Sequence, residues 1–373
     1  MADLFAEVVG QRVAVSILKS ALEQGASHAY LFSGPPGVGK DSAAVAFAAG
    51  LACADGGCGE CNTCRRVLEG VHPDVETVAA EGNEILLPQI AQINTHAVYR
   101  PYEARAKVYI LLEAETLRLE AANSFLKTLE EPPPHVFFLL VTDRLEKMRP
   151  TVVSRCQPVF FSPVPDPVLA SDLVQRYGLP EAEATLLARV SGGNLRYARE
   201  LATTESAREE RSRLLDMARD LPRLGLLDRE VALDELMATV ESRASERVGE
   251  LESELARALE WAGDARTKAW LKKRHEERVK RQQRRLVTQG LQTATRVLAG
   301  WYRDLALVSA GADQGVVNQD RLEELRSAAG AAGALTYAGA VEAANKASER
   351  LRYNVDARCA IGDMFRSIEE ALT

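Results

Sequence analysis

The sequence lacks the long apolar runs that membrane insertion or secretion requires. Apolar stretches such as Ala43 to Ala54 fall far short of the roughly 20 residues that a membrane-spanning helix needs. The N-terminal segment Met1 to Glu7 carries two acidic residues and has no apolar signal-peptide core. We therefore expect a cytoplasmic protein without membrane contact.

An excess of positive charge is also missing. The 373 residues carry a formal net charge of −7, which argues against binding of nucleic acid by the chain as a whole and leaves room only for a local basic face. Hydrophobic residues make up 46% of the chain and charged residues 27%, as in soluble proteins with buried cores. The length predicts two or three domains.

Cysteine is scarce and unevenly placed. Four of the six cysteines fall between positions 53 and 64, namely Cys53, Cys58, Cys61 and Cys64. In a cytoplasmic chain such a cluster favours a metal over disulfides, and four thiolates at this spacing predict a closed, structural Zn²⁺ site. A redox-active pair, or a knuckle that has lost its metal, are the alternatives. Cys156 and Cys359 stand alone, and we expect both to be ordinary buried residues.

The stretch LFSGPPGVGKDS, residues 31–42, has the spacing of a phosphate-binding loop. Its glycines let successive backbone N–H groups turn towards one anion, the following helix adds its positive end, and Lys40 can reach the terminal phosphates. The expected nucleotide-binding residues here are Gly34, Pro35, Pro36, Gly37, Val38, Gly39, Lys40, Asp41 and Ser42.

Two positions depart from the pattern of an active nucleotidase. A Ser or Thr should follow the lysine because its hydroxyl coordinates Mg²⁺, and this chain has Asp41 there. The apolar strand 107–112 ends where an acid should hold Mg²⁺, but that position is Leu112 and only Glu113 remains. We therefore expect ATP or ADP to bind with impaired Mg²⁺ coordination, and no independent ATPase activity.

Strands and helices alternate up to residue 161. The predicted strands are 28–32, 75–78, 107–112, 135–142 and 158–161. This alternation predicts an α/β fold, with a parallel sheet covered by helices on both faces. From Val168 to Ala202 the pattern indicates a compact helical lid, in which residues 191–194 cap the helix that carries Arg196.

From about Ser206 the chain is nearly all helical, and its expected packing anchors are Trp261, Trp270, Trp301 and Tyr302. The segment 268–285 contains nine Lys or Arg and two acids. A solvated helix face is favoured over a DNA-binding stripe, because no aromatic residue beyond Trp270 interleaves the run.

Several motifs occur in a fixed order over roughly residues 5 to 205. They are VVGQ at 8–11, HAYLFSGPPGVGK at 28–40, the four-cysteine knuckle, ANSFLKTLEEPP at 122–133 and SRC at 154–156. In this order they resemble the bacterial clamp-loader branch of the AAA+ family. The resemblance implies an AAA+ core over 1–165 with a zinc knuckle at 53–64, a helical lid over 166–205 and an all-helical collar over 206–373.

The resemblance also assigns roles to single residues. It implies that Val9, Gly10 and Gln11 lie near the adenine, that Thr142 occupies the sensor-1 position and that Arg196 occupies the sensor-2 position. Arg155, in SRC, would be an arginine finger that reaches the nucleotide site of a neighbouring subunit, since a guanidinium can neutralise charge on a transferring phosphoryl group in trans.

The implied partners are the gamma/tau and delta subunits in a hetero-pentameric ring, and through that ring the sliding clamp and primed DNA. Asp41 and Leu112 favour a subunit other than the ATPase motor of this branch. A zinc-dependent nucleic-acid-binding module is a third hypothesis. The net negative charge counts against it, as does a knuckle with only Arg65 and Arg66 beside it.

Overall fold

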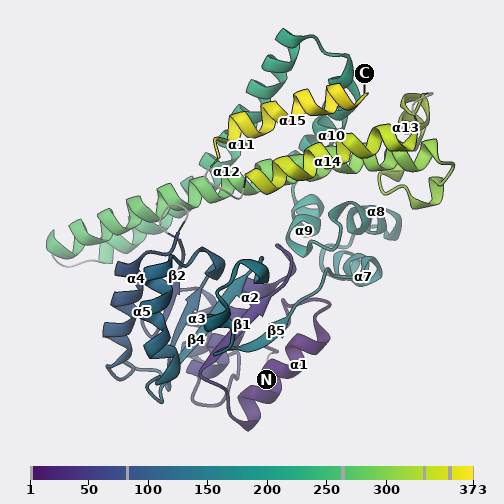
Figure 1. The fold of residues 1–373 in the computed structure, drawn as a ribbon. Coiled ribbons are helices and arrows are strands. Elements are labelled where there is room, and N and C mark those ends of the chain that lie inside the picture. The colour runs from purple at the N-terminus through teal and green to yellow at the C-terminus, as the bar shows by residue number, and fades with distance from the viewer. Residues whose placement is uncertain (1–2, 81–83, 262–264, 331–332, 352–354, 373) are drawn as a thin grey trace. The chain divides into compact units, whose positions relative to one another are not determined.

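The computed structural model describes residues 3–80, 84–261, 265–330, 333–351 and 355–372, and the side chains of 250–278 and 280–282 also lie outside the description. The chain divides into two compact units, Met1–Thr203 and Thr204–Thr373 (Figure 1). Each unit has its own hydrophobic core. In the part of the chain that the structure describes, no helix is long and apolar enough to cross a membrane.

The first unit alternates strands and helices before it ends in three helices. Its elements are α1 (Arg12–Gln24), β1 (Ala29–Ser33), α2 (Lys40–Ala52), α3 (Asn62–Leu68), β2 (Val75–Val78), α4 (Leu87–Ala97), β3 (Lys107–Leu111), η1 (Ala114–Thr116), α5 (Leu119–Glu130), β4 (Val136–Thr142), η2 (Leu145–Lys147), α6 (Pro150–Val153), β5 (Gln157–Phe160), α7 (Asp166–Tyr177), α8 (Glu181–Ser191) and α9 (Leu195–Thr203).

The five strands form one parallel sheet in the order β2-β3-β4-β1-β5. The predicted α/β class with a parallel sheet is therefore confirmed. In the register of β1 and β4, Ser33 lies opposite Thr142, so the segments that follow these two strands leave the sheet side by side. This carboxyl edge is where open α/β sheets bind their ligands.

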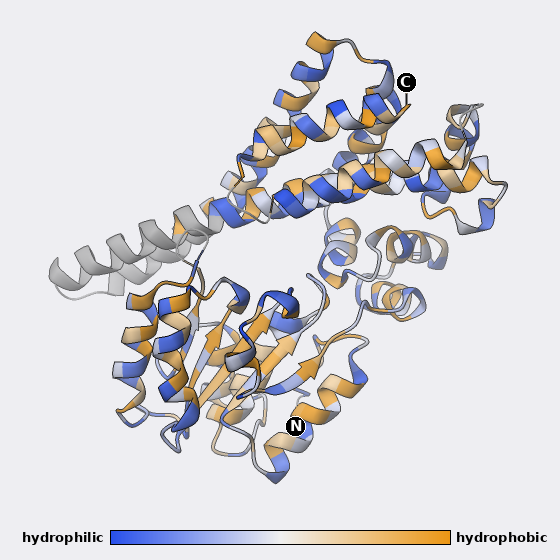
Figure 2. Ribbon diagram, in the orientation of Figure 1, coloured by the Kyte–Doolittle hydropathy of each residue, from blue (hydrophilic) through white to orange (hydrophobic). Residues whose placement is uncertain are grey.

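Two cores cover the two faces of the sheet. On one face α1, α2 and α3 pack against alternate strand residues such as Phe32 and Ile110. On the other face α4, α5 and α6 pack against the intervening residues, such as Leu31 and Phe138. Because the central strands β1, β3 and β4 are buried on both faces, their sequences are almost continuously apolar, which Figure 2 shows as orange arrows between helices.

Helix α4 was missed from the sequence, although its apolar residues recur at helical spacing. Ile90, Ile93 and Ala97 follow the i, i+3, i+7 pattern and are buried against the sheet, whereas Leu87, one turn earlier, is exposed. The helix begins after Leu86, whose backbone N–H donates to the Gln89 side chain.

The second unit is helical throughout the residues that the structure describes. Its elements are α10 (Glu205–Asp220), η3 (Leu221–Arg223), α11 (Leu226–Trp261), α12 (Ala265–Ser309), η4 (Asp313–Gly315), η5 (Gln319–Arg321), α13 (Leu322–Ala328), α14 (Ala334–Arg350) and α15 (Ala357–Leu372).

Trp301 and Tyr302 are almost fully buried in the core of this unit, so their prediction as packing anchors is confirmed. The Tyr302 hydroxyl donates to the carbonyl of Ala218 at 2.7 Å and ties α12 to α10. The side chains of Trp261, of Trp270 and of most of the basic segment 268–285 lie outside the described residues.

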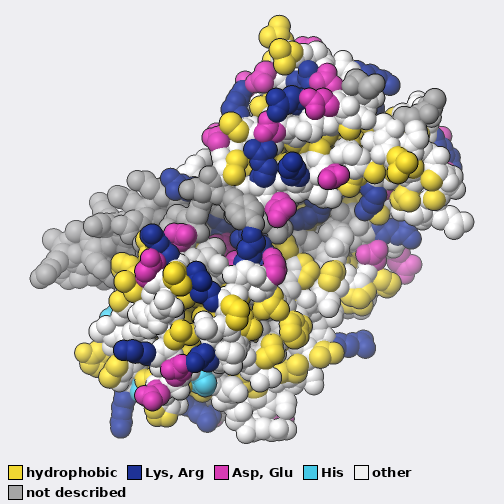
Figure 3. All heavy atoms as spheres, viewed as in Figure 1, with side chains coloured by type: hydrophobic (Ala, Val, Ile, Leu, Met, Phe, Trp, Pro, Cys, Tyr) yellow, Lys and Arg dark blue, Asp and Glu magenta, His cyan; other side chains and the backbone are white. Residues whose placement is uncertain are grey.

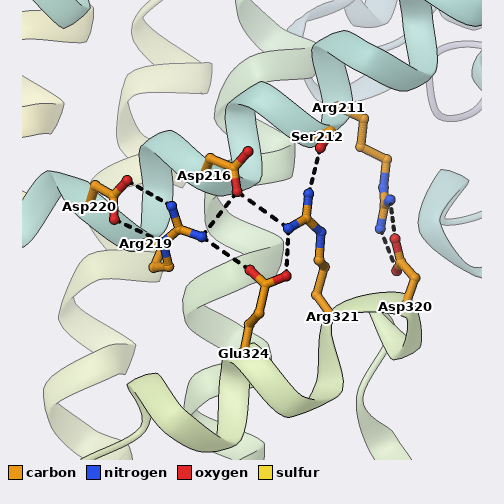
Figure 4. A network of polar contacts seen from close by, with 8 residues as sticks. All are labelled: Arg211, Ser212, Asp216, Arg219, Asp220, Asp320, Arg321 and Glu324. Carbon is orange, nitrogen blue, oxygen red and sulfur yellow. Dashed lines mark hydrogen bonds and ion pairs between the residues drawn. The ribbon is translucent and has the colours of Figure 1, made fainter.

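A polar network fastens α13 and the preceding turn to α10. Figure 4 shows its members, which are Arg211, Ser212, Asp216, Arg219, Asp220, Asp320, Arg321 and Glu324. Arg211 donates to both carboxylate oxygens of Asp320, at 2.7 and 3.0 Å, and Arg321 bridges Asp216 and Glu324. Elsewhere on the face drawn in Figure 3, acidic and basic side chains are interspersed.

Candidate nucleotide site and metal centre

The predicted phosphate-binding loop, residues 34–39, lies between the end of β1 and the start of α2. Gly37 and Gly39 have φ angles of 76° and 99°, a backbone conformation that favours glycine. A Cβ atom on Gly37 would lie 2.1 Å from the Asn194 side chain, so the space between the loop and α9 admits only glycine. The Arg196 backbone N–H also donates to the Gly37 carbonyl, at 3.2 Å.

Lys40 is buried and its ammonium group is fully engaged within the chain. Its Nζ donates to the Gly34 carbonyl at 2.8 Å and to the Pro35 carbonyl, and it pairs with Oδ1 of Asp143 at 2.7 Å. An ammonium group has three N–H donors, so these three acceptors satisfy it. Asp143 follows Thr142 at the end of β4, which the strand register places beside the loop.

The other predicted phosphate-side residues have partners inside the same site. Arg196 pairs with Asp41 at 3.5 Å, and Asp41 lies in the first turn of α2. Thr142 donates its hydroxyl to Glu115 at 2.7 Å. Leu112 packs against the core beside α2, so an apolar side chain occupies the position where a nucleotidase would place a metal-binding acid.

The residues expected near the adenine show one clear structural role. Gln11 is buried, donates to the carbonyls of Val38 and Ser162 at 3.3 and 2.7 Å, and accepts from the Ser162 backbone at 3.1 Å. It therefore joins the chain before α1 to the phosphate loop and to the segment after β5. Of the two residues before Gln11, Val9 is half-buried and Gly10 is exposed.

Arg155 lies just beyond α6. Its guanidinium donates to the Thr151 carbonyl at 2.8 Å and to the Ser154 hydroxyl at 3.4 Å, and it pairs with Glu130 of α5. About a third of its side chain, 32%, is exposed. These partners belong to α5, to α6 and to the turn after α6, not to the phosphate loop of the same chain.

The four clustered cysteines converge on one point before and within α3. Their Sγ atoms all lie within 4.8 Å of one another, and three of the pairs are 3.8, 3.8 and 4.0 Å apart. Thiolates bound to Zn²⁺ at about 2.3 Å in a tetrahedron lie about 3.8 Å apart. These thiols therefore fit a tetrahedral metal ion such as zinc.

The knuckle backbone favours thiolates at this point. The N–H groups of Cys61 and Cys64 point at the sulfurs of Cys58 and Cys61, at 3.3 and 3.4 Å. Burial opposes ionisation of Cys53, but hydrogen bonds from backbone N–H groups outweigh it and lower its pKa to about 7. The pKa of Cys64 is raised, by burial and then by its neighbouring thiols.

The two lone cysteines differ from each other. Cys156 is buried as expected, and burial raises its pKa to about 12. The expectation for Cys359 is wrong, because this residue is exposed. It lies in the first turn of α15, where its backbone N–H is capped by the Asp356 carboxylate at 2.9 Å.

Three site residues were missed by sequence reasoning, namely Asp143, Glu115 and Asn194. Asp143 directly follows Thr142, and Asn194 stands two residues before Arg196, so their sequence positions were a usable signal. Asn194 was expected only as part of a helix cap. It does accept from the Tyr197 backbone at 3.0 Å, and the same side chain also packs against the phosphate loop.

A five-stranded parallel sheet covered by helices, with a GxxxxGK loop between β1 and α2, defines an α/β protein of the P-loop class. Residues 10–165 match the family described as "DNA polymerase III, delta subunit". The chain is 34% identical to DNA polymerase III subunit tau of Escherichia coli over 268 residues, which is 69% of this chain and 41% of tau. It is also 34% identical to subunit delta' of Bacillus subtilis over 194 residues, 51% of this chain and 58% of delta'.

A solved gamma subunit-related protein of Thermotoga maritima aligns with 96% of this chain and 100% of its own length, at 17% identity and a TM-score of 0.40. By sequence, the chain is a relative of the DNA polymerase III clamp-loader subunits, the AAA+ group that includes delta', tau and gamma. It spans less than two thirds of the length of these two curated relatives.

Proposed function

We propose that the chain is the delta-prime subunit of a DNA polymerase III clamp loader. In this role it joins gamma/tau and delta subunits in a hetero-pentameric ring and helps to load the sliding clamp onto primed DNA during replication. It contributes an arginine finger to a neighbour's ATP site and does not hydrolyse ATP alone. Its segments 1–165, 166–205 and 206–373 act as AAA+ core, lid and collar.

The observation that carries this proposal is the state of the chain's own phosphate site. Leu112 supplies no carboxylate for Mg²⁺, and Asp41 replaces the hydroxyl that would coordinate it. Lys40, which should meet the terminal phosphates, is paired with Asp143. Phosphoryl transfer depends almost wholly on such positioned charges, so a site without them suits a subunit that does not run the reaction.

The surroundings of Arg155 support the role in trans. Its guanidinium is held at the surface by Thr151 and Glu130 and stays partly exposed. A partly exposed guanidinium can exchange a carboxylate for a phosphate group of the nucleotide bound to a neighbouring chain. The planar carboxylate and the tetrahedral phosphate are both anions that can accept two N–H groups from one guanidinium. Glu130 is thus the resting partner that a neighbour's nucleotide replaces.

The four-cysteine knuckle holds one structural Zn²⁺ in this proposal. All four ligand positions are cysteines, so a bound ion would have no open coordination position for substrate or water. ATP or ADP binds at residues 34–42, with contributions from Val9, Gly10, Gln11, Thr142 and Arg196.

Reconstituted loader complexes test the proposal. Arg155→Ala should leave ring assembly intact and lower DNA-stimulated ATP hydrolysis, because a finger supplied in trans contributes on the order of a thousandfold at its own site. Intact sites elsewhere in the ring dilute that loss. Arg149→Ala is the matched control, since it removes a positive charge from an exposed residue six positions earlier.

Size-exclusion chromatography checks the assembly of every complex. We expect near-normal hydrolysis with Arg149→Ala and with Lys40→Ala in this chain. Full activity of the Arg155→Ala complex, at unchanged assembly, would refute the role in trans.

A gamma/tau-like ATPase motor is the second candidate, favoured by one observation. The alignment with Escherichia coli tau covers more of this chain than the alignment with Bacillus subtilis delta' does, and the GxxxxGK spacing is intact. Steady-state ATP hydrolysis by the purified chain, abolished by Lys40→Ala, would establish the motor and displace the first proposal.

A further inference from the structure

The phosphate site contains two carboxylates beside the two cations that should attract nucleotide. Asp143 pairs with Lys40 at 2.7 Å, and Asp41 pairs with Arg196 at 3.5 Å. The two acids come from different elements, the end of β4 and the first turn of α2. Asp41 directly follows the loop in the chain. Asp143 reaches the loop because β1 and β4 are paired in register, with Ser33 opposite Thr142.

We propose that Asp143 and Asp41 act as built-in competitors of the nucleotide phosphates. Asp143 occupies Lys40, Asp41 occupies Arg196, and nucleotide binds only after Asp143 has left the lysine. In this proposal the two carboxylates lower the nucleotide affinity of the chain, while the backbone of the loop remains suited to an anion. The inference rests on the nucleotide-site assignment, but it does not depend on any role for Arg155.

The position of Lys40 makes Asp143 the residue that must move. The lysine side chain is only 2% exposed and two of its donors are held by the loop carbonyls of Gly34 and Pro35. The Asp143 side chain is 38% exposed, so it can turn into water at little cost. An incoming phosphate can therefore replace the carboxylate while the two carbonyl contacts stay in place.

Asp41 weakens the attraction of the N-terminus of α2 for a phosphate. It lies in the first turn of α2, where the aligned peptide dipoles favour a negative charge. A carboxylate in that turn uses part of the field that would otherwise act on a phosphate, and at the same time it pairs with Arg196. Two cations and one helix terminus are thus partly neutralised before nucleotide arrives.

The loop geometry itself is ready for an anion. Gly37 and Gly39 have the left-handed φ angles that turn N–H groups inward, and α2 begins directly at Lys40. The backbone contact from Arg196 to Gly37 holds the loop against α9. Charge, not backbone shape, is therefore the feature that sets this site apart from one that binds phosphate tightly.

Isothermal titration of the full chain with ADP, and separately with inorganic pyrophosphate, tests the inference. Asp143→Asn keeps an oxygen acceptor for Lys40 but removes the competing charge, and we expect ADP affinity to rise by about tenfold, or about 1.4 kcal/mol. Pyrophosphate should gain similarly, because the competition concerns the phosphates and not the base. Glu146→Gln is the matched control, since Glu146 is an exposed acid three residues further on.

A second substitution tests whether the gain in ADP affinity depends on Lys40. In the double variant Lys40→Ala, Asp143→Asn the gain should vanish, because the released cation is then absent. Equal or weaker ADP binding by Asp143→Asn would overturn the inference, and so would an equal gain from Glu146→Gln. Absence of ADP and pyrophosphate binding to both wild type and Asp143→Asn at millimolar concentration would overturn it as well, whatever the Arg155 variants do in the assembled loader.

Discussion

Asp74 should control the stability of the loop between α4 and β3. This buried carboxylate lies just before β2 and accepts three backbone N–H groups, from Tyr102 at 2.6 Å and from Glu103 and Ala104 at 2.9 Å each. Three donors on one carboxylate fix the course of the loop as it enters β3. Asp74→Asn keeps the shape of the side chain but turns one acceptor into an NH₂ group.

The expected loss follows from these contacts. If the NH₂ group replaces Oδ2, it faces the N–H groups of Glu103 and Ala104, and two hydrogen bonds to a charged acceptor are lost. Such bonds contribute about 1.5–3 kcal/mol each, so the free energy of unfolding of the first unit should fall by about 3 kcal/mol. Rotation of the amide limits the damage to the Tyr102 bond and sets a lower bound of about 1.5 kcal/mol.

The pH dependence of this difference has a definite sign. Burial opposes ionisation of Asp74, but its hydrogen bonds from Glu103, Tyr102 and Ala104 outweigh burial and lower its pKa. A depressed carboxyl pKa in the folded state contributes stability above the unfolded value of about 3.9 and loses it as the pH falls below that value. The difference between wild type and Asp74→Asn should therefore be constant above about pH 5 and shrink below about pH 4.

Urea unfolding followed by hydrogen exchange and mass spectrometry measures this difference for each unit separately. Exchange at residues 102–104 should accelerate in Asp74→Asn, while α10–α15 stay unchanged. Glu103→Gln removes a half-exposed carboxylate from the same loop and should cost no more than about 1 kcal/mol. A loss below 1 kcal/mol for Asp74→Asn, or a difference that grows on acidification, would refute the reasoning.

Three further outcomes are expected. Metal analysis should find one Zn²⁺ per chain, and finding no zinc in protein purified under reducing conditions would contradict this. Cys58→Ser should lower the melting temperature without abolishing the fold, since the sheet cores lie elsewhere. Tyr302→Phe should cost about 1–3 kcal/mol in urea unfolding, because the buried Ala218 carbonyl loses its donor, and an unchanged midpoint would contradict it. Arg211→Met should cost about 3 kcal/mol by leaving Asp320 without its bidentate partner, and a more stable variant would show that apolar packing compensates.

Much of the fold could be predicted because its three central strands are buried on both faces. The predicted bounds of all five strands agree with the structure to within a residue or two, because apolar and β-branched residues mark the strands and glycine, proline and polar residues separate them. The cysteine cluster was equally clear, because four thiols within twelve positions cannot lie far apart. In these cases neighbours in the sequence are also neighbours in space.

The parts that escaped prediction depend on pairing between distant segments. The contact between Lys40 and Asp143 joins residues about one hundred positions apart, and it exists because β4 lies beside β1 in one register. Sequence gives the polarity of Asp143 but not the strand order that brings it to the loop. The contact of Asn194 with Gly37 likewise requires α9 to fold back onto the sheet unit.

Arg155 and Arg196, the two arginines with expected roles at a nucleotide site, differ in the location of their ion-pair partners. Both were assigned by resemblance, and neither sequence context reveals whose phosphate it serves. In the structure Arg196 pairs with Asp41 of its own phosphate site, whereas Arg155 pairs with Glu130, outside that site. An arginine already matched by an acid of its own loop is poorly placed to assist hydrolysis there. Arg155 makes its ion pair with an acid outside that site, and the proposed role in trans therefore concerns this arginine and not Arg196.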